Sequence, residues 1–142
     1  MKTLQNYVST LSHSAGICLY HFVFVCKYRR SYITETLSRD LRLYLYHAAE
    51  ELKVTIETLE FGYDGENQTE FNHVHLLINA PQTLSPSKIA SSIKARTKFY
   101  LGKGYPEFKD IDFWKTGYFV STVSLGNNLE ATRAYIEGQT KH

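Results

Sequence analysis

The chain has 142 residues, of which 43% are hydrophobic and 21% are charged, and its formal net charge is +2. This length suits one compact domain, and the composition is that of an ordinary soluble globular protein and excludes a disordered one. We therefore expect a single domain over residues 1–142, with residues 1–12 as a loosely ordered N-terminal segment.

The first predicted element is a central strand over residues 16–26, which are rich in Val, Phe, Tyr and Ile. At eleven residues this apolar run is too short to span a bilayer. The N-terminal residues also lack the apolar core of a signal peptide. We therefore expect a cytoplasmic protein that does not associate with membranes.

Three side chains inside this strand are interpreted as structural. Cys18 and Cys26 would lie about 26 Å apart along the strand, which is beyond the reach of a disulfide. Both are therefore interpreted as reduced, half-buried packing residues. His21 is likewise interpreted as a satisfied structural histidine. Directly after the strand, Tyr28, Arg29 and Arg30 form a short basic segment.

The middle of the chain predicts one helix and two further strands. Residues 34–53 carry an apolar stripe at helical spacing, with Thr34 as the N-cap. Residues 54–61 predict the second strand, and the polar residues 62–72 predict a loop. In residues 73–79, Val74, Leu76 and Ile78 recur at every second position as one apolar face, and Pro81 is expected to end this third strand.

The last third of the chain predicts a helix, a strand and a short final helix. Ser85 and Pro86 are an N-cap and a first helical residue, opening a helix that runs to about Leu101, with Gly102 and Gly104 as its stop. Residues 118–124 predict a fourth strand, and residues 129–139 a terminal helix. Trp114 is interpreted as a packing residue.

The element order β-α-β-β-α-β-α predicts an α+β fold of the ferredoxin-like kind. Its antiparallel sheet would carry helices on one face. The other face would be left for a ligand or for the C-terminal helix.

A local basic block indicates an anionic partner. Between Phe71 and Pro106 the chain carries five basic residues and no acid. A solvated helix face explains the block equally well. The candidate nucleic-acid contacts are Arg29, Arg30, Lys88, Lys94, Arg96 and Lys98.

Two residue pairs could carry chemistry. His73 and His75 are two positions apart on a strand, so both imidazoles leave the face opposite Val74, as neighbouring metal ligands would. Tyr135 and Gln139 are four positions apart on the final helix and share one face of it. Either pair alone has a structural explanation.

Together, five motifs resemble HUH-type single-tyrosine transposases, the TnpA-like enzymes of bacterial and archaeal insertion sequences. The motifs are FNHVHLLI at residues 71–78, YIEGQ at 135–139, YHFVFVCKYRR at 20–30, LSPSKI at 84–89, and FW at 113–114 followed by GYFV at 117–120. They occur in the family's order over nearly the whole chain.

The resemblance implies an enzyme that cleaves and rejoins single-stranded DNA at hairpin-bearing transposon ends. Tyr135 would be the nucleophile and would form a 5′-phosphotyrosine intermediate. His73, His75 and Gln139 would bind Mg²⁺ or Mn²⁺, which activates the scissile phosphate. The protein would act as a homodimer, with the Tyr135 helix exchanged between subunits, and would associate with the nucleoid during transposition.

Two features depart from the family's pattern. Asn72 stands where the family usually has Asp directly before the first histidine, and the loop over residues 62–70 is longer than usual. The first departure puts in doubt any role of that acid at the metal site, and the second bears on dimer or DNA contacts.

Two alternative functions remain. A domesticated relative would process chromosomal hairpin repeats rather than move an element. A non-catalytic nucleic-acid-binding module would use the sheet as RNA-recognition domains do, with no need for His73, His75 and Tyr135 together.

Overall fold

The computed structural model describes residues 17–65 and 69–123. The secondary-structure elements in chain order are β1 (Ile17–Val25), the 3-10 turn η1 (Lys27–Arg29), α2 (Glu35–Leu52), β2 (Thr55–Gly62), β3 (His73–Pro81), α3 (Pro86–Gly104), η2 (Pro106–Phe108) and β4 (Phe119–Thr122). The expected N-terminal segment and the expected final helix, which carries Tyr135 and Gln139, lie outside these residues.

The four strands form one antiparallel sheet in the order β2-β3-β1-β4. The central pair, β1 and β3, places Val25 opposite His73 and Val23 opposite His75. The hairpin of β2 and β3 places Gly62 opposite His73. This order confirms the predicted ferredoxin-like arrangement of the sheet.

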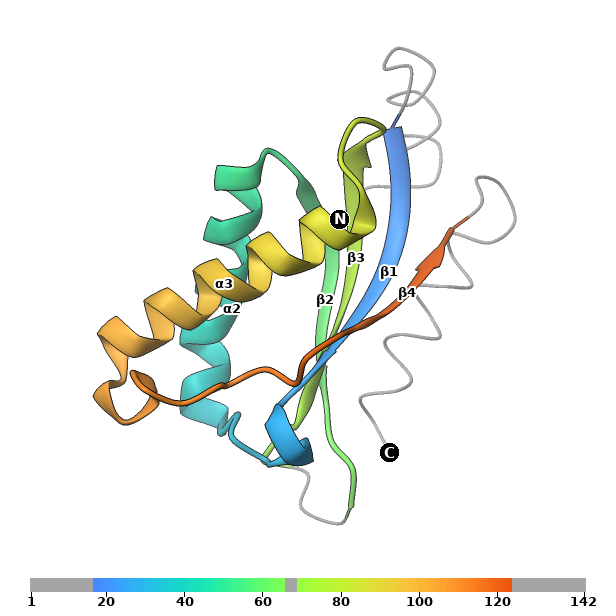
Figure 1. The fold of residues 1–142 in the computed structure, drawn as a ribbon. Coiled ribbons are helices and arrows are strands. Elements are labelled where there is room, and N and C mark those ends of the chain that lie inside the picture. The colour runs from blue at the N-terminus through green and yellow to red at the C-terminus, as the bar shows by residue number, and fades with distance from the viewer. Residues whose placement is uncertain (1–16, 66–68, 124–142) are drawn as a thin grey trace.

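Helices α2 and α3 both pack on one face of the sheet (Figure 1). Successive side chains of a strand point to opposite faces of the sheet, and the apolar ones fill the space between the sheet and the two helices. The largest fully buried ones on the strands are Phe22, Phe24, Leu76, Leu77 and Ile78. Of these, Leu77 has the strand parity of the histidines, whereas the others face the helices.

The helix ends follow the predicted capping residues. The Thr34 side chain accepts a hydrogen bond from the Leu37 amide, and the Ser85 side chain accepts one from the Lys88 amide. The helix α3 continues past the predicted Leu101 and through Gly102, and it ends at Gly104, the second of the two glycines predicted to stop it. A side chain added at Gly102 would come within 3.2 Å of the Lys109 backbone, so glycine here permits the chain to fold back along the helix.

Several predictions about single residues can be compared with the structure. Cys18 and Cys26 are free, as predicted, and Cys26 is fully rather than half buried. Trp114 is buried and donates from Nε1 to Thr97 Oγ1 at 3.0 Å, which confirms its packing role. Pro81 ends β3, as predicted, and the strand includes Ala80 and Pro81 beyond the predicted Asn79. Within the part of the chain that is described, no helix is long and apolar enough to cross a membrane.

Candidate metal and nucleic-acid site

His73 and His75 lie next to each other at the start of β3, on the face of the sheet that the helices do not cover. Their ring centroids are 5.1 Å apart, with the planes at 74°. Val74 between them is fully buried toward the helices. The side chains of His73 and His75 retain only 9% and 5% exposure, so the two imidazoles occupy a site from which water is largely excluded.

His75 has one ring nitrogen engaged and one without a partner. Its Nδ1 lies 3.1 Å from Nε2 of His21, and the two rings stack with centroids 5.3 Å apart. Its Nε2 is buried and has no hydrogen-bond partner among the described residues. Burial, reinforced by the neighbouring His73 and His21, lowers the pKa of His75 to about 4. His75 is therefore neutral at pH 7, with an orphaned buried nitrogen.

The ring of His73 is positioned by Asn72 and by the absence of a side chain at Gly62. Its Nδ1 lies 2.6 Å from Oδ1 of Asn72, which is itself buried. A Cβ atom on Gly62, the cross-strand neighbour, would lie 2.2 Å from Nε2 of His73, so glycine provides the space that the ring occupies. Burial lowers the pKa of His73 as well, more than the nearby Asp64 carboxylate raises it.

The donor chemistry of this pair fits a divalent cation. Metal-binding histidines are neutral and commonly use their second ring nitrogen for a hydrogen bond that fixes the ring. Here each Nδ1 has such a partner, and an unpaired buried Nε2 remains on His75. Within residues 17–65 and 69–123 no cluster of three His, Cys, Asp or Glu side chains could complete a metal site. A third ligand would therefore have to come from elsewhere, and the predicted Gln139 lies outside these residues.

His21 and Asp64 belong to this site, although the sequence did not assign them to it. His21 alternates with the core residues Tyr20 and Phe22, so strand parity was a signal that its ring leaves the helix-covered face. Asp64 follows β2 and contacts Asn72 through a hydrogen bond of 2.9 Å. No pattern in the sequence indicates that contact, because it depends on how the loop folds back.

Four of the six predicted DNA-contacting residues are engaged with other groups of the protein. Lys94 is half-buried and donates to the carbonyls of Lys115 and Gly117, each at 2.6 Å. Three others pair with acids: Arg29 with Asp64, Arg96 with Glu51 and Lys98 with Asp112. Lys88 and Arg30 are exposed. The Lys94 ammonium therefore joins α3 to the segment before β4.

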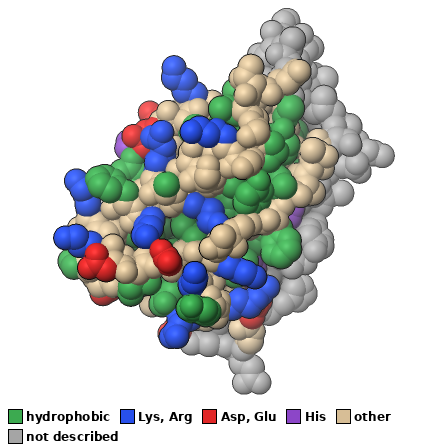
Figure 2. Space-filling model, viewed as in Figure 1, with side chains coloured by type: hydrophobic (Ala, Val, Ile, Leu, Met, Phe, Trp, Pro, Cys, Tyr) green, Lys and Arg blue, Asp and Glu red, His purple; other side chains and the backbone are tan. Residues whose placement is uncertain are grey.

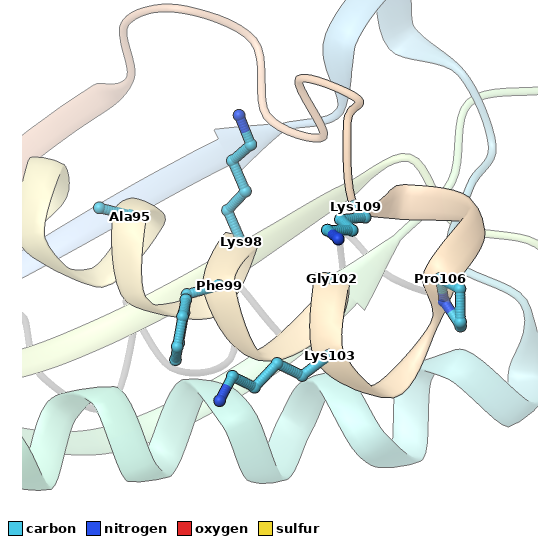
Figure 3. A pocket seen from close by; sticks show the side chains of 7 residues that line it. All are labelled: Ala95, Lys98, Phe99, Gly102, Lys103, Pro106 and Lys109. Atoms are coloured by element: carbon cyan, nitrogen blue, oxygen red, sulfur yellow. The ribbon is translucent and has the colours of Figure 1, made fainter.

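A cleft of about 670 Å³ lies between the C-terminal half of α3 and the chain that folds back along it. Figure 3 shows Phe99 and Lys103 on the same side of α3, with Lys98 leaving it in another direction and Lys109 on the returning segment. The Phe99 ring is 58% exposed, and Lys103 Nζ lies 4.7 Å from its centroid.

The lining of this cleft combines an apolar floor with cations, and no acid lines it among the described residues. Lys and Arg side chains also cover more of the face seen in Figure 2 than Asp and Glu do. Both features suit a ligand that has flat rings and negative charge.

Comparison with known proteins gives matches that extend over nearly the whole chain. The family model described as IS200-like transposase matches residues 14–139. The transposases for insertion sequence element IS200 of Salmonella typhimurium and Salmonella typhi are each 30% identical to this chain over 137 residues, covering 92% of this chain and 82% of their own length.

Comparison with solved structures finds the same architecture. A candidate transposase from Deinococcus radiodurans superposes with a TM-score of 0.63 at 23% identity, covering 85% of this chain and 89% of its own. A REP-associated tyrosine transposase bound to a REP hairpin superposes with a TM-score of 0.59 at 15% identity, covering 86% of this chain and 64% of its own. At these identities the likeness concerns the fold.

Proposed function

The chain belongs to the IS200-like transposase family, and on that premise we propose that it cleaves and rejoins single-stranded DNA at hairpin-bearing transposon ends. The observation that carries this proposal is the paired arrangement of His73 and His75. Each Nδ1 is held by a neighbour, and the buried Nε2 of His75 has no partner within the described part of the chain.

We propose Tyr135 as the nucleophile. Its phenolate oxygen would form a bond to the scissile phosphorus while the bond from phosphorus to the 3′ oxygen breaks, and the departing oxygen takes up a proton. The products are a 5′-phosphotyrosine and a free 3′-OH. The 3′-OH of another strand can then attack the phosphotyrosine and restore the phosphodiester, so the step conserves the bond energy and needs no nucleotide cofactor.

His73 and His75 would hold Mg²⁺ or Mn²⁺, together with Gln139 from the C-terminal segment. When bound, the ion would supply positive charge at the scissile phosphate and lower the cost of forming phenolate near it. Neutral imidazoles suit this role because they leave the full charge of the ion available. The low pKa of His75 keeps that residue neutral through the physiological range.

For the DNA itself, we propose that the cleft beside Phe99 contributes to strand binding. An exposed aromatic ring can stack on a base, and Lys98, Lys103 and Lys109 can approach phosphates on either side of it. The hairpin that the REP-associated relative binds makes a DNA hairpin the natural substrate to test. The protein would act in the cytoplasm, at the nucleoid.

A covalent-adduct assay tests the catalytic proposal. End-labelled single-stranded DNA carrying a transposon-end hairpin is incubated with the protein and Mg²⁺, then separated on a denaturing protein gel. We expect a labelled protein band that is lost with EDTA and in Tyr135→Phe. If the band persists in Tyr135→Phe, another residue is the nucleophile; if no band forms on the cognate hairpin, the chain binds DNA without cutting it.

We further propose a homodimer in which the Tyr135 helix of one subunit completes the partner's metal site. Mixing Tyr135→Phe with His73→Ala subunits tests the exchange, because each variant alone is inactive. If the helix is exchanged, the heterodimer has one intact site and one doubly defective site, and activity returns. If each helix serves its own subunit, both sites keep one defect and mixing restores nothing.

A further inference from the structure

A chain of hydrogen bonds runs from the loop after β2 to the first histidine. Asn72 Nδ2 lies 2.9 Å from Oδ2 of Asp64, and Asn72 Oδ1 lies 2.6 Å from Nδ1 of His73. Arg29 Nη1 reaches the same Asp64 oxygen at 2.7 Å. Three residues of the loop and of β3 are thus joined in series, with Arg29 at the outer end.

The chemistry of these groups fixes the direction of each hydrogen bond. An ionised carboxylate can only accept, so the amide nitrogen of Asn72 must face Asp64 and its oxygen must face His73. An amide oxygen can only accept as well, so Nδ1 of His73 must carry the proton. In the neutral imidazole the lone pair is then on Nε2, which is the nitrogen left for a metal ion.

Burial and backbone hydrogen bonds hold Asn72 in place between Asp64 and His73. Asn72 is 2% exposed, and its backbone is bound on both sides, to Cys26 by a hydrogen bond of 2.8 Å and to Gly62 by one of 3.0 Å. The carbonyl of Arg29 is a second acceptor for Asn72 Nδ2, at 3.4 Å. The Asp64 carboxylate and the Arg29 carbonyl thus both lie next to Asn72 Nδ2. If the Asn72 side chain were flipped, its oxygen would face these two acceptors and no hydrogen bond could form.

The turn after β1 positions Arg29, which contacts Asp64. Tyr28 and Arg29 both have left-handed backbone conformations, with φ of 58° and 53°. Such conformations are unfavourable for residues other than glycine and persist where the surroundings require them. With the backbone in this conformation, Arg29 makes two contacts: its carbonyl accepts from Asn72 Nδ2, and its guanidinium donates to Asp64. The hydrogen bond from Asn72, assisted by Arg29, lowers the pKa of Asp64.

We propose that Asp64 is a positioning residue of the metal site, which acts through Asn72 to hold His73 in the Nδ1–H tautomer. This inference rests on the proposed metal site but not on the identity of the DNA substrate. Asp64 acts through Asn72 rather than as a ligand, because its Oδ2 already accepts from Asn72 and Arg29.

Histidine tautomers in the metal-free protein give the direct test. In long-range ¹H–¹⁵N spectra of ¹⁵N-histidine-labelled protein, the wild type should show His73 protonated at Nδ1. In Asp64→Asn, the new amide can turn either its oxygen or its nitrogen toward Asn72, which leaves the Arg29 carbonyl at 3.4 Å as the one fixed acceptor on that side, so His73 should become a mixture of tautomers. Mn²⁺ affinity measured by calorimetry should fall about 10- to 100-fold, as is typical when the partner of a ligating histidine is lost.

An exchanged pair provides the rescue. In Asp64→Asn combined with Asn72→Asp, the carboxylate next to His73 can only accept, so the Nδ1–H tautomer and the Mn²⁺ affinity should both return. Two controls should keep the wild-type tautomer: Arg29→Gln removes the ion pair but leaves Asp64, and Asp110→Asn removes an exposed carboxylate elsewhere.

The proposal is overturned if Asp64→Asn keeps a single Nδ1–H tautomer at His73, or if the tautomer changes while the Mn²⁺ affinity does not. It is also overturned if the exchanged pair behaves like Asp64→Asn, because loss of structure would then explain both. Neither measurement uses DNA. A protein with the expected tautomer and Mn²⁺ affinity that forms no covalent adduct would contradict the proposed function alone.

Discussion

The Nε2 atom of His21 on β1 lies 3.1 Å from Nδ1 of His75 on β3, and the two rings stack at 24°. The contact crosses the central strand pair diagonally, because His21 is paired in register with Leu77 and His75 with Val23. His21 is half-buried, and burial lowers its pKa. A neutral His21 can accept the Nδ1 proton of His75, which leaves the lone pair of His75 on its orphaned Nε2.

Replacing His21 should therefore weaken metal binding without removing a ligand. We expect His21→Leu to lower the Mn²⁺ affinity about 10- to 100-fold, because His75 loses the partner that orients its ring. His21→Gln should recover part of the loss, since an amide oxygen can still accept. The measurement is calorimetric titration with Mn²⁺, and His47→Gln on the exposed side of α2 is the control. Equal affinity for His21→Leu and the wild type would show that the contact is only packing.

His21 also marks a limit of prediction from the sequence. The alternation of Val74, Leu76 and Ile78 was sufficient to place His73 and His75 on the face away from the helices, because strand geometry fixes that relation locally. Whether His21 reaches one of them depends on the register between β1 and β3. That register is a tertiary property, and the interpretation of His21 as merely structural missed the contact.

The basic residues and the loop show the same limit. Helical spacing correctly placed Lys94 on a polar face of α3, but its ammonium donates to two carbonyls of the segment before β4. The sequence identified Asn72 as a departure from the family pattern and left its role open. The fold of the loop brings Asp64 to Asn72, so contacts between distant segments decide both cases.

The buried histidines should make the metal-free protein less stable in mild acid. The pKa of His75 is about 4 in the folded protein and 6.5 in the unfolded reference, so the unfolded chain binds the proton more readily. The contribution is fully present above pH 6.5 and is lost as the pH falls toward 4. Allowing for partial solvation, we expect a loss of about 1–2 kcal/mol by pH 5. The lowered pKa values of His73 and His21 act in the same direction.

Urea unfolding at pH 7 and pH 5 measures this effect, with His75→Gln as the comparison. The variant should lose less stability between the two pH values, because it lacks the titrating group. Asp64 contributes in a different window, since its lowered pKa places its titration below 3.8. A wild type and a variant with the same difference between pH 7 and pH 5 would contradict the assignment to His75.

Gly62 should tolerate no side chain while His73 is present. A Cβ atom there would lie 2.2, 2.6 and 2.9 Å from three atoms of the imidazole, so the ring must move. We expect Gly62→Ala to lower the free energy of unfolding by about 1–3 kcal/mol, as overpacking does, and to reduce Mn²⁺ binding. The clash is removed in Gly62→Ala combined with His73→Ala. That double variant should be more stable than the sum of the two single changes predicts, and simple additivity would show that the ring is not the obstacle.

Phe99 and Lys103 allow the proposed DNA role of the cleft to be separated into stacking and charge. Phe99→Ala should weaken binding of an unstructured single-stranded oligonucleotide about 5- to 100-fold, which corresponds to the loss of one stacked base. Lys103→Ala should instead lower the slope of log affinity against log salt by about 0.7, the value for one released phosphate contact on a single strand. Fluorescence anisotropy across a salt series measures both quantities. Leu43→Ala, an exposed apolar residue of α2 outside the cleft, and Lys53→Ala at the end of that helix are the matched controls. If the cleft variants bind the oligonucleotide as the controls do, the cleft does not contact DNA.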